Sequence, residues 1–166
     1  MASTPARVAG HPIHPMLVPL PIGLFVFSLA CDVLSRSGAP GTMWSDMAFF
    51  AMAGGVIGAF LAAVPGIIDF ISLLGSGERR VRTIAATHMG INLTVVALYV
   101  ANLYLRTRPA PHSGVSFALS LLAMGVLLVS GWLGGELVYV HGVAVAEEPA
   151  AEFIERPSPL RRQVAH

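Results

Sequence analysis

The amino-acid sequence predicts an all-α, polytopic membrane protein: four transmembrane helices in an up-down bundle, with both termini on the same side of the membrane. Of the 166 residues, 55% are hydrophobic and only 11% are charged, which is less than half the charged fraction of a typical soluble domain. The chain also contains four apolar runs, each long enough to cross a hydrocarbon core about 30 Å thick as a helix. Glycine (17 residues) and proline (12 residues) are frequent, and membrane helices tolerate both.

The four apolar runs place the expected helices at about residues 16–34, 47–74, 82–105 and 115–140. Pro15, just before the first run, suits the first turn of a helix, where a missing N–H costs nothing. The second run is longer than a straight crossing needs, so we expect it to tilt or to kink at Pro65. Four crossings return the chain to the side on which it began.

The chain divides into a transmembrane domain, residues 1–145, and a polar tail, residues 146–166. Glutamate and proline concentrate in the tail, and such a segment does not remain in lipid, so we expect a flexible appendage. Positive residues are retained on the cytoplasmic face, and arginine is more frequent on the side of the termini, which predicts cytoplasmic termini. That side carries Arg7, Arg79, Arg80, Arg82, Arg156, Arg161 and Arg162, and the opposite side carries Arg36, Arg106 and Arg108.

Charge and cysteine content exclude several classes of protein. The formal net charge is +1, so there is no positive field that would attract nucleic acid. Cys31 is the one cysteine of the sequence and cannot form an internal disulfide, so the fold depends on packing.

Small residues spaced four apart predict where helices approach one another closely. The second helix carries Gly54, Gly58, Ala62 and Gly66, and the fourth carries Gly131 and Gly135, with Gly134 beside them. We interpret these as packing surfaces within the bundle, with contact to a second copy as the alternative. The aromatic side chains Phe25, Phe27, Tyr99, Tyr104 and Tyr139 are expected at the lipid or the membrane interface, and Asp32 is expected to cap or pair locally.

Ionisable residues fall at a common depth on the side of the termini. Because ionisable groups inside a membrane are costly, they are expected to face the bundle interior with a partner. Helix direction alternates, so the ends of four successive helices deliver their polar side chains to one layer. The residues of this layer are His11, His14, Asp69, His88, Glu136 and His141, with Asn92, Trp132 and Arg82 in supporting positions.

Structural roles compete with ligand roles at most of these positions. Asp69 can form an ion pair with Arg82, which begins the next helix. His88 and Asn92 can be a hydrogen-bonded pair between helices. Glu136 is expected to orient a histidine or an arginine more often than to act as an acid, and Trp132 suits packing better than stacking on a cofactor.

The sequence resembles the bacterial membrane family called domain of unknown function 2231, over essentially all of residues 11 to 145. The resemblance implies a location in the bacterial inner membrane. In some relatives a similar membrane unit is joined to a Rieske-type iron-sulfur domain or to a c-type cytochrome module, which implies electron transfer with separate redox proteins by association. The matching motifs are His11-Pro-Ile-His-Pro15, Pro21-Ile-Gly23, Pro65-Gly-Ile-Ile-Asp69, His88 with Asn92, and Ser130-Gly-Trp-Leu-Gly-Gly-Glu-Leu-Val-Tyr-Val-His141-Gly142.

The layer of histidines favours a b-type haem site for electron transfer. Haem iron accepts two axial imidazoles, and four-helix bundles build cofactor sites from side chains on facing helices. We expect His14 and His88 to be the axial pair, because they come from separate helices at comparable depth. His11 and His141 are reserves or a second pair, and Arg79, Arg80 and Arg82 are available to the haem propionates.

Two other functions remain open. The same four histidines, together with Asp69 and Glu136, suit a bare Fe, Zn, Cu or Mn ion. Alternatively, the polar layer holds helices together in a structural subunit or scaffold of a larger membrane complex of respiratory or photosynthetic type, or in a homo-oligomer. No catalytic residues are assigned. Because no internal repeat is evident, and four helices give little room for alternating access, transport by the unit alone is not expected.

Overall fold

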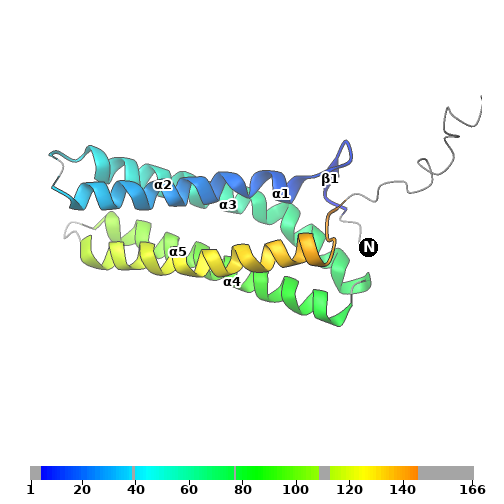
Figure 1. The fold of residues 1–166 in the computed structure, drawn as a ribbon. Helices are drawn as coiled ribbons and strands as arrows, with labels where there is room; N and C mark the ends of the chain where they lie inside the picture. The colour runs from blue at the N-terminus through cyan, green and yellow to red at the C-terminus, as the bar shows by residue number, and fades with distance from the viewer. Residues whose placement is uncertain (1–4, 39, 77, 109–112, 146–166) are drawn as a thin grey trace, which may run out of the picture.

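The computed structural model describes residues 5–38, 40–76, 78–108 and 113–145. These residues form a bundle of long helices that cross back and forth (Figure 1). Four helical stretches, Ile13–Arg36, Met43–Gly75, Arg79–Arg106 and Gly114–Val140, are long and apolar enough to cross a membrane. The four predicted crossings are therefore confirmed. The tail predicted for residues 146–166 lies outside the described residues.

Each crossing is slightly longer than its apolar run. The first crossing consists of α1 (Ile13–Leu17) and α2 (Pro19–Arg36), and α5 ends in a π-helical turn, η1. Helices continue past the hydrocarbon core because their polar ends can reach the headgroup region. The remaining elements are α3 (Met43–Ser76), α4 (Arg79–Arg106), α5 (Ser113–Gly135) and η1 (Glu136–Val140).

A short β-hairpin precedes the first crossing. β1 (Arg7–Val8) pairs antiparallel with β2 (His11–Pro12), and Ala9 and Gly10 both have positive φ, as a two-residue hairpin turn requires. The hairpin lies at the end of the bundle where α3 meets α4 and where η1 ends (Figure 1). Its attachment is specific: the Ala6 backbone N–H donates to Asp69 Oδ1 at 3.0 Å.

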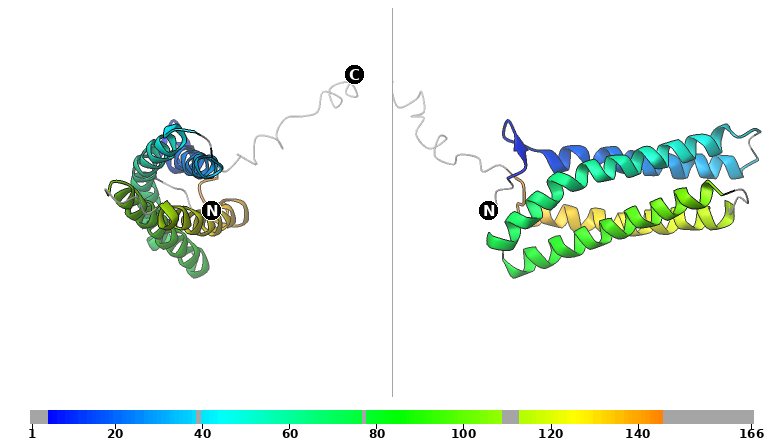
Figure 2. Two further views of the ribbon diagram at one scale, coloured as in Figure 1. Left: turned by 90° about the vertical axis from the view of Figure 1, so that its left-hand side faces the viewer. Right: turned by 180° about the vertical axis from the view of Figure 1, so that it is seen from behind.

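The helices form two hairpins that repeat the same interactions. The first hairpin is α1/α2 with α3, and the second is α4 with α5; Figure 2 shows the bundle end-on and from behind. In the outgoing helices, residues 74 positions apart play corresponding parts: His14 and His88, Phe25 and Tyr99, Ser28 and Asn102, Asp32 and Arg106. In the returning helices the offset is 68: Ala48 and Ser116, Ala62 and Ser130, Gly66 and Gly134.

Side-chain hydrogen bonds support this correspondence. Ser28 Oγ donates to the Ala48 carbonyl oxygen at 2.7 Å, and Asn102 Nδ2 donates to the Ser116 carbonyl oxygen at 2.9 Å. Both offsets apply at once, so the two hairpins make corresponding contacts at corresponding positions. The correspondence lies in the contacts that these side chains make, and not in a repeat that is evident in the sequence. Few residues are identical between the two hairpins, and the offset changes from 74 in the outgoing helices to 68 in the returning helices.

The two hairpins meet through a pair of stacked aromatic rings. Phe25 and Tyr99 stack with ring centroids 3.8 Å apart and an interplanar angle of 5°. Their side chains are only 2% and 1% exposed, so the expectation that they face lipid was wrong. With Met52, Val56, Val95 and Ala123 they form the central apolar cluster of the bundle.

The glycine stripe of α3 packs against the first crossing, which confirms internal helix packing. A Cβ at Gly55, next to the stripe, would lie 2.5 Å from the Phe25 ring, and one at Gly54 would lie 3.3 Å from Leu24. In α5 the expected pair differs: Gly131 has open space around it, and Gly134 makes the close contact. Helix rotation decides which glycine faces inward, and spacing alone does not define it.

Pro65 lies inside α3, which bends along its length (Figure 2). A proline inside a helix removes one backbone hydrogen bond and clashes with the preceding turn, so a bend is expected there. The bend lies at the level where the candidate site begins.

Candidate functional site

His14 is anchored to α3 at the proline bend. Its Nδ1–H donates to the Ala62 carbonyl oxygen at 2.8 Å, three residues before Pro65 in α3. A carbonyl only accepts hydrogen bonds, so in the neutral ring Nδ1 holds the proton and Nε2 keeps a lone pair. The ring rests on Gly66, where a Cβ would lie 2.8 Å from Nδ1.

His88 is anchored to α5 in the corresponding way. Its Nδ1–H donates to the Ser130 carbonyl oxygen at 2.9 Å, and Ser130 Oγ lies 3.1 Å from the same nitrogen. The ring rests beside Gly134, where a Cβ would lie 3.1 Å from Cε1. Nε2 again carries the lone pair, and it accepts a hydrogen bond from Asn92 Nδ2 at 3.0 Å.

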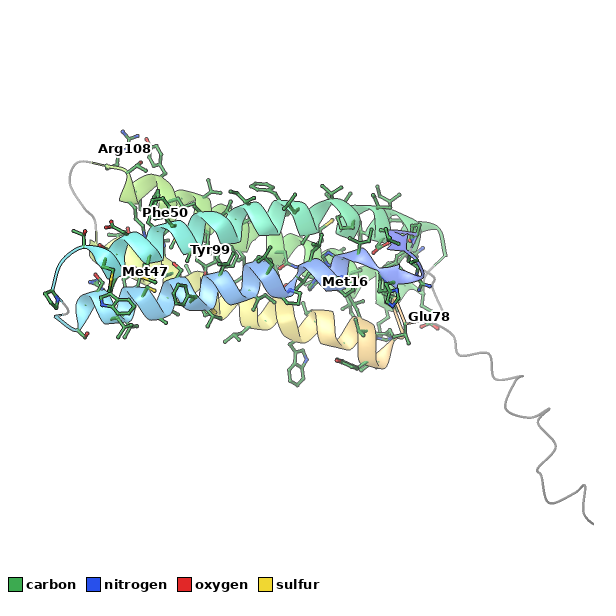
Figure 3. All side chains as sticks on the ribbon, turned by 90° about the horizontal axis from the view of Figure 1, so that it is seen from above. Met16, Met47, Phe50, Glu78, Tyr99 and Arg108 are labelled. Carbon is green, nitrogen blue, oxygen red and sulfur yellow. The ribbon has the colours of Figure 1, made fainter. Side chains whose placement is uncertain are left out.

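The two anchored histidines, with Ala62, Gly66, Ser130 and Gly134, form one polar layer, which we call the histidine layer. His14 and His88 lie at corresponding positions of the two hairpins, each held by a backbone carbonyl of its partner helix. The layer lies between the central apolar cluster and a second apolar cluster, formed by Leu73, Val81, Ala85, Leu137 and Val143. Figure 3 shows Glu78 at one end of the bundle and Tyr99 farther along it. Apolar side chains therefore flank the paired histidines on both sides along the bundle axis.

The other two predicted histidines lie elsewhere. His11 is on the exposed β-hairpin, where its Nδ1 lies 3.0 Å from the Ala9 carbonyl oxygen. His141 follows the π-helical turn, and its Nε2 lies 3.8 Å from Glu136 Oε1. Glu136 also pairs with Arg80 at 3.5 Å. Within the described ranges, no group of three or more His, Cys, Asp or Glu side chains is placed to hold a metal ion.

The carboxylate and supporting residues have local partners. Asp69 is buried and accepts the Ala6 N–H, while Arg82 Nη1 donates to the Leu74 carbonyl oxygen at 3.3 Å. Asn92 is the supporting residue that contacts a histidine of the layer. Trp132 is 78% exposed, so its indole points away from the bundle interior.

Asp32 and Arg106 form a second polar site at the opposite end of the bundle. Arg106 makes two hydrogen bonds to the Asp32 carboxylate, and Ser120 Oγ donates to the same carboxylate at 3.2 Å. The expectation that Asp32 pairs locally was wrong, because its partner is 74 residues away in sequence and only the packing of the two hairpins brings them together.

The sequence did not reveal the backbone carbonyls that hold the two histidines or the glycines against which their rings pack. The signal was present: Ala62 and Gly66, and Ser130 and Gly134, share one spacing. Three buried polar atoms also have no hydrogen-bond partner among the described residues. They are Arg7 Nε, Tyr99 Oη and His141 Nε2.

One comparison with known proteins returns a match. The family model described as a predicted membrane protein (DUF2231) matches residues 10–147. No curated protein and no solved structure matches the chain.

Proposed function

This chain belongs to the predicted membrane protein family DUF2231, and we propose that it binds one b-type haem between His14 and His88 for electron transfer in the membrane. One observation supports the proposal above all others. Two imidazoles, one from each hairpin, are fixed through Nδ1 to backbone carbonyls and each keeps a lone pair on Nε2. Haem bound by two such ligands supplies one-electron redox chemistry.

The number of available ligands favours haem over a bare metal ion. A porphyrin provides four nitrogen ligands of its own, so the protein needs to add only two. A bare transition-metal ion takes most of its ligands from side chains. Among the described residues the acidic side chains that could complete such a set have other contacts: Asp69 holds Ala6, and Glu136 pairs with Arg80.

The surrounding residues would orient the two ligands. A histidine ligand is commonly held through its second nitrogen by a carbonyl or carboxylate, which fixes the ring plane and makes the nitrogen a better ligand. The carbonyls of Ala62 and Ser130 do this here, and Gly66 and Gly134 leave room for the rings. The two apolar clusters would limit water on either side of the layer.

Absorption spectroscopy and elemental analysis of detergent-purified protein test the proposal. The protein is expected to be red, with a Soret band and about one iron per chain. His14→Ala and His88→Ala should each abolish or strongly reduce the Soret band. His11→Ala and His141→Ala are the matched controls, and both should retain it, because those rings lie outside the histidine layer.

The same measurements distinguish the alternatives. A colourless preparation with about one transition-metal ion per chain would replace haem with a bare ion site. A preparation with neither cofactor would leave a structural subunit or scaffold, with the histidine layer holding the two hairpins together. Loss of the Soret band in His11→Ala or His141→Ala, with His14→Ala unaffected, would show that His14 and His88 are not the ligand pair.

We further propose that the protein lies in the bacterial inner membrane with its histidine layer near the cytoplasmic face. The exposed Arg79 and Arg80 lie at this end of the bundle, and positive residues are retained on the cytoplasmic side. Electron transfer would require a separate redox protein, of iron-sulfur or c-type cytochrome class, or assembly into a larger complex. A reporter enzyme fused after residue 166 is expected to lie on the cytoplasmic side. A reporter found on the other side of the membrane would show the opposite orientation.

A further inference from the structure

The two anchored histidines differ at the nitrogen that would bind iron. His88 Nε2 accepts a hydrogen bond from Asn92 Nδ2 at 3.0 Å, one helical turn away. The repeat makes Val18 the counterpart of Asn92, 74 positions earlier. The Val18 N–H bonds the His14 carbonyl oxygen at 3.2 Å, so Val18 also lies one turn after its histidine. Valine has no polar group to offer to Nε2.

The hydrogen bond from Asn92 uses the lone pair that a metal would need. Because His88 Nδ1 donates to a carbonyl, Nε2 has a single lone pair and no proton. That lone pair accepts the amide hydrogen or binds a metal, but not both. Asn92 therefore competes with a metal for His88, and His14 has no such competitor at the corresponding position.

We infer that the two histidines are unequal ligands: His14 is the permanent ligand, and His88 is a displaceable ligand that Asn92 holds in reserve. This rests on the haem site of the proposed function. A neutral hydrogen bond of this kind shifts an equilibrium by about 5-fold. A corresponding fraction of the reduced protein would have one axial position open to a small neutral ligand of the carbon monoxide type.

Asn92→Val tests the inference directly, because it installs the residue that the other hairpin carries. With the amide removed, His88 holds the iron more firmly, and carbon monoxide affinity of the reduced protein should fall by about 5-fold. Asn92→Ala should act in the same direction, and it keeps the test available if the valine variant folds poorly. Val18→Asn is the reciprocal variant, and it should weaken haem binding at His14.

A measurement without haem tests the hydrogen bond separately. In the full chain prepared haem-free with ¹⁵N-labelled histidine, Asn92→Val should shift the Nε2 resonance of His88 and leave that of His14 unchanged. Both the ¹⁵N shift and the fall in carbon monoxide affinity are expected.

Three results would overturn the inference, and they are distinguishable. A colourless wild-type protein would overturn the haem site and the inference together. A haem-loaded wild type whose carbon monoxide affinity is the same in Asn92→Val would overturn only the inequality of the ligands. An unchanged His88 Nε2 resonance would show that the amide does not hold that nitrogen.

Discussion

Asp32 and Arg106 form a two-pronged ion pair from equivalent positions of the two hairpins. Arg106 Nη1 lies 2.9 Å from Asp32 Oδ1, and Nη2 lies 2.6 Å from Oδ2. Both side chains are largely buried. Arg106 Nε donates to Asn102 Oδ1, and Asn102 in turn donates to Ser120 Oγ. The pair thus joins the two hairpins at the end of the bundle opposite the histidine layer.

Asp32→Asn is expected to lower the unfolding free energy by about 3–5 kcal/mol, because it leaves the Arg106 guanidinium buried without an opposite charge. The measurement is thermal or denaturant unfolding in detergent. Asp46→Asn, an exposed carboxylate at the start of α3, serves as the control and should change stability little.

The exchanged variant Asp32→Arg with Arg106→Asp tests whether the repeat relates the two positions. Because the two positions correspond in the two hairpins, the double variant should recover at least half of the stability lost in Asp32→Asn. A double variant less stable than the single one would contradict the equivalence of the two sites.

Gly66→Ala is expected to displace the His14 ring. The added Cβ would lie 2.8 Å from Nδ1 and 2.9 Å from Cε1, closer than such atoms approach, so the hydrogen bond to Ala62 must break. Gly134→Ala should have a milder effect, since its Cβ would lie 3.1 Å from the His88 ring. The Soret absorbance per chain measures both.

Gly131→Ala provides the matched control for the glycine series. It adds the same methyl group one turn from Gly134, into open space, and alanine favours a helix over glycine by about 1 kcal/mol. Cofactor content should stay at the wild-type level. An equal loss of cofactor in Gly131→Ala and Gly66→Ala would mean that helix packing in general, and not the contact of Gly66 with the His14 ring, controls the site.

Tyr99→Phe is expected to leave stability unchanged or to raise it by about 1 kcal/mol. The hydroxyl is buried and has no partner among the described residues, so its removal relieves an unsatisfied polar group. Tyr99→Ala should cost about 3–5 kcal/mol, because it also removes the ring stacked on Phe25. Unfolding curves measure the change in stability of both variants. A clear destabilisation by Tyr99→Phe would show that an ordered water binds the hydroxyl.

Asp69→Ala is expected to loosen the β-hairpin without disturbing the helices. Asp69 accepts the Ala6 N–H at 3.0 Å, and this bond ties the segment before β1 to α3. Amide hydrogen exchange of residues 5–12 should accelerate by about 10-fold, while exchange in α3 stays slow. Asp69→Asn, whose side-chain oxygen can still accept the bond, should show a smaller effect. Equal exchange in all three proteins would place the attachment elsewhere.

Much of the histidine layer could be predicted from the sequence. His14 and His88 stand at the same depth because the helices alternate in direction, and their spacing from the helix ends is readable. The hydrogen-bond acceptors of these rings were not readable. Ala62 and Ser130 act through backbone carbonyls, which no side-chain pattern reveals, and Gly66 was recognised only as a packing residue.

The helical rotations explain why the remaining expectations differ from the structure. The sequence favours the lipid or the membrane interface for Tyr99, but an aromatic residue in a membrane helix suits the core equally well. His11 is three residues from His14, so the sequence predicts both in one site. The hairpin turn at Ala9 and Gly10 instead places His11 on the exposed surface.

The sequence by itself determined that the chain has four helices long and apolar enough to cross a membrane, because that property depends on composition and length alone. The tertiary structure decided which residues of these helices meet. Asp32 with Arg106, Phe25 with Tyr99, and the two histidine anchors all depend on how each helix is rotated about its own axis and how one hairpin packs on the other. Those angles are set by close packing of small residues and rings, and a single sequence without its packing does not specify them.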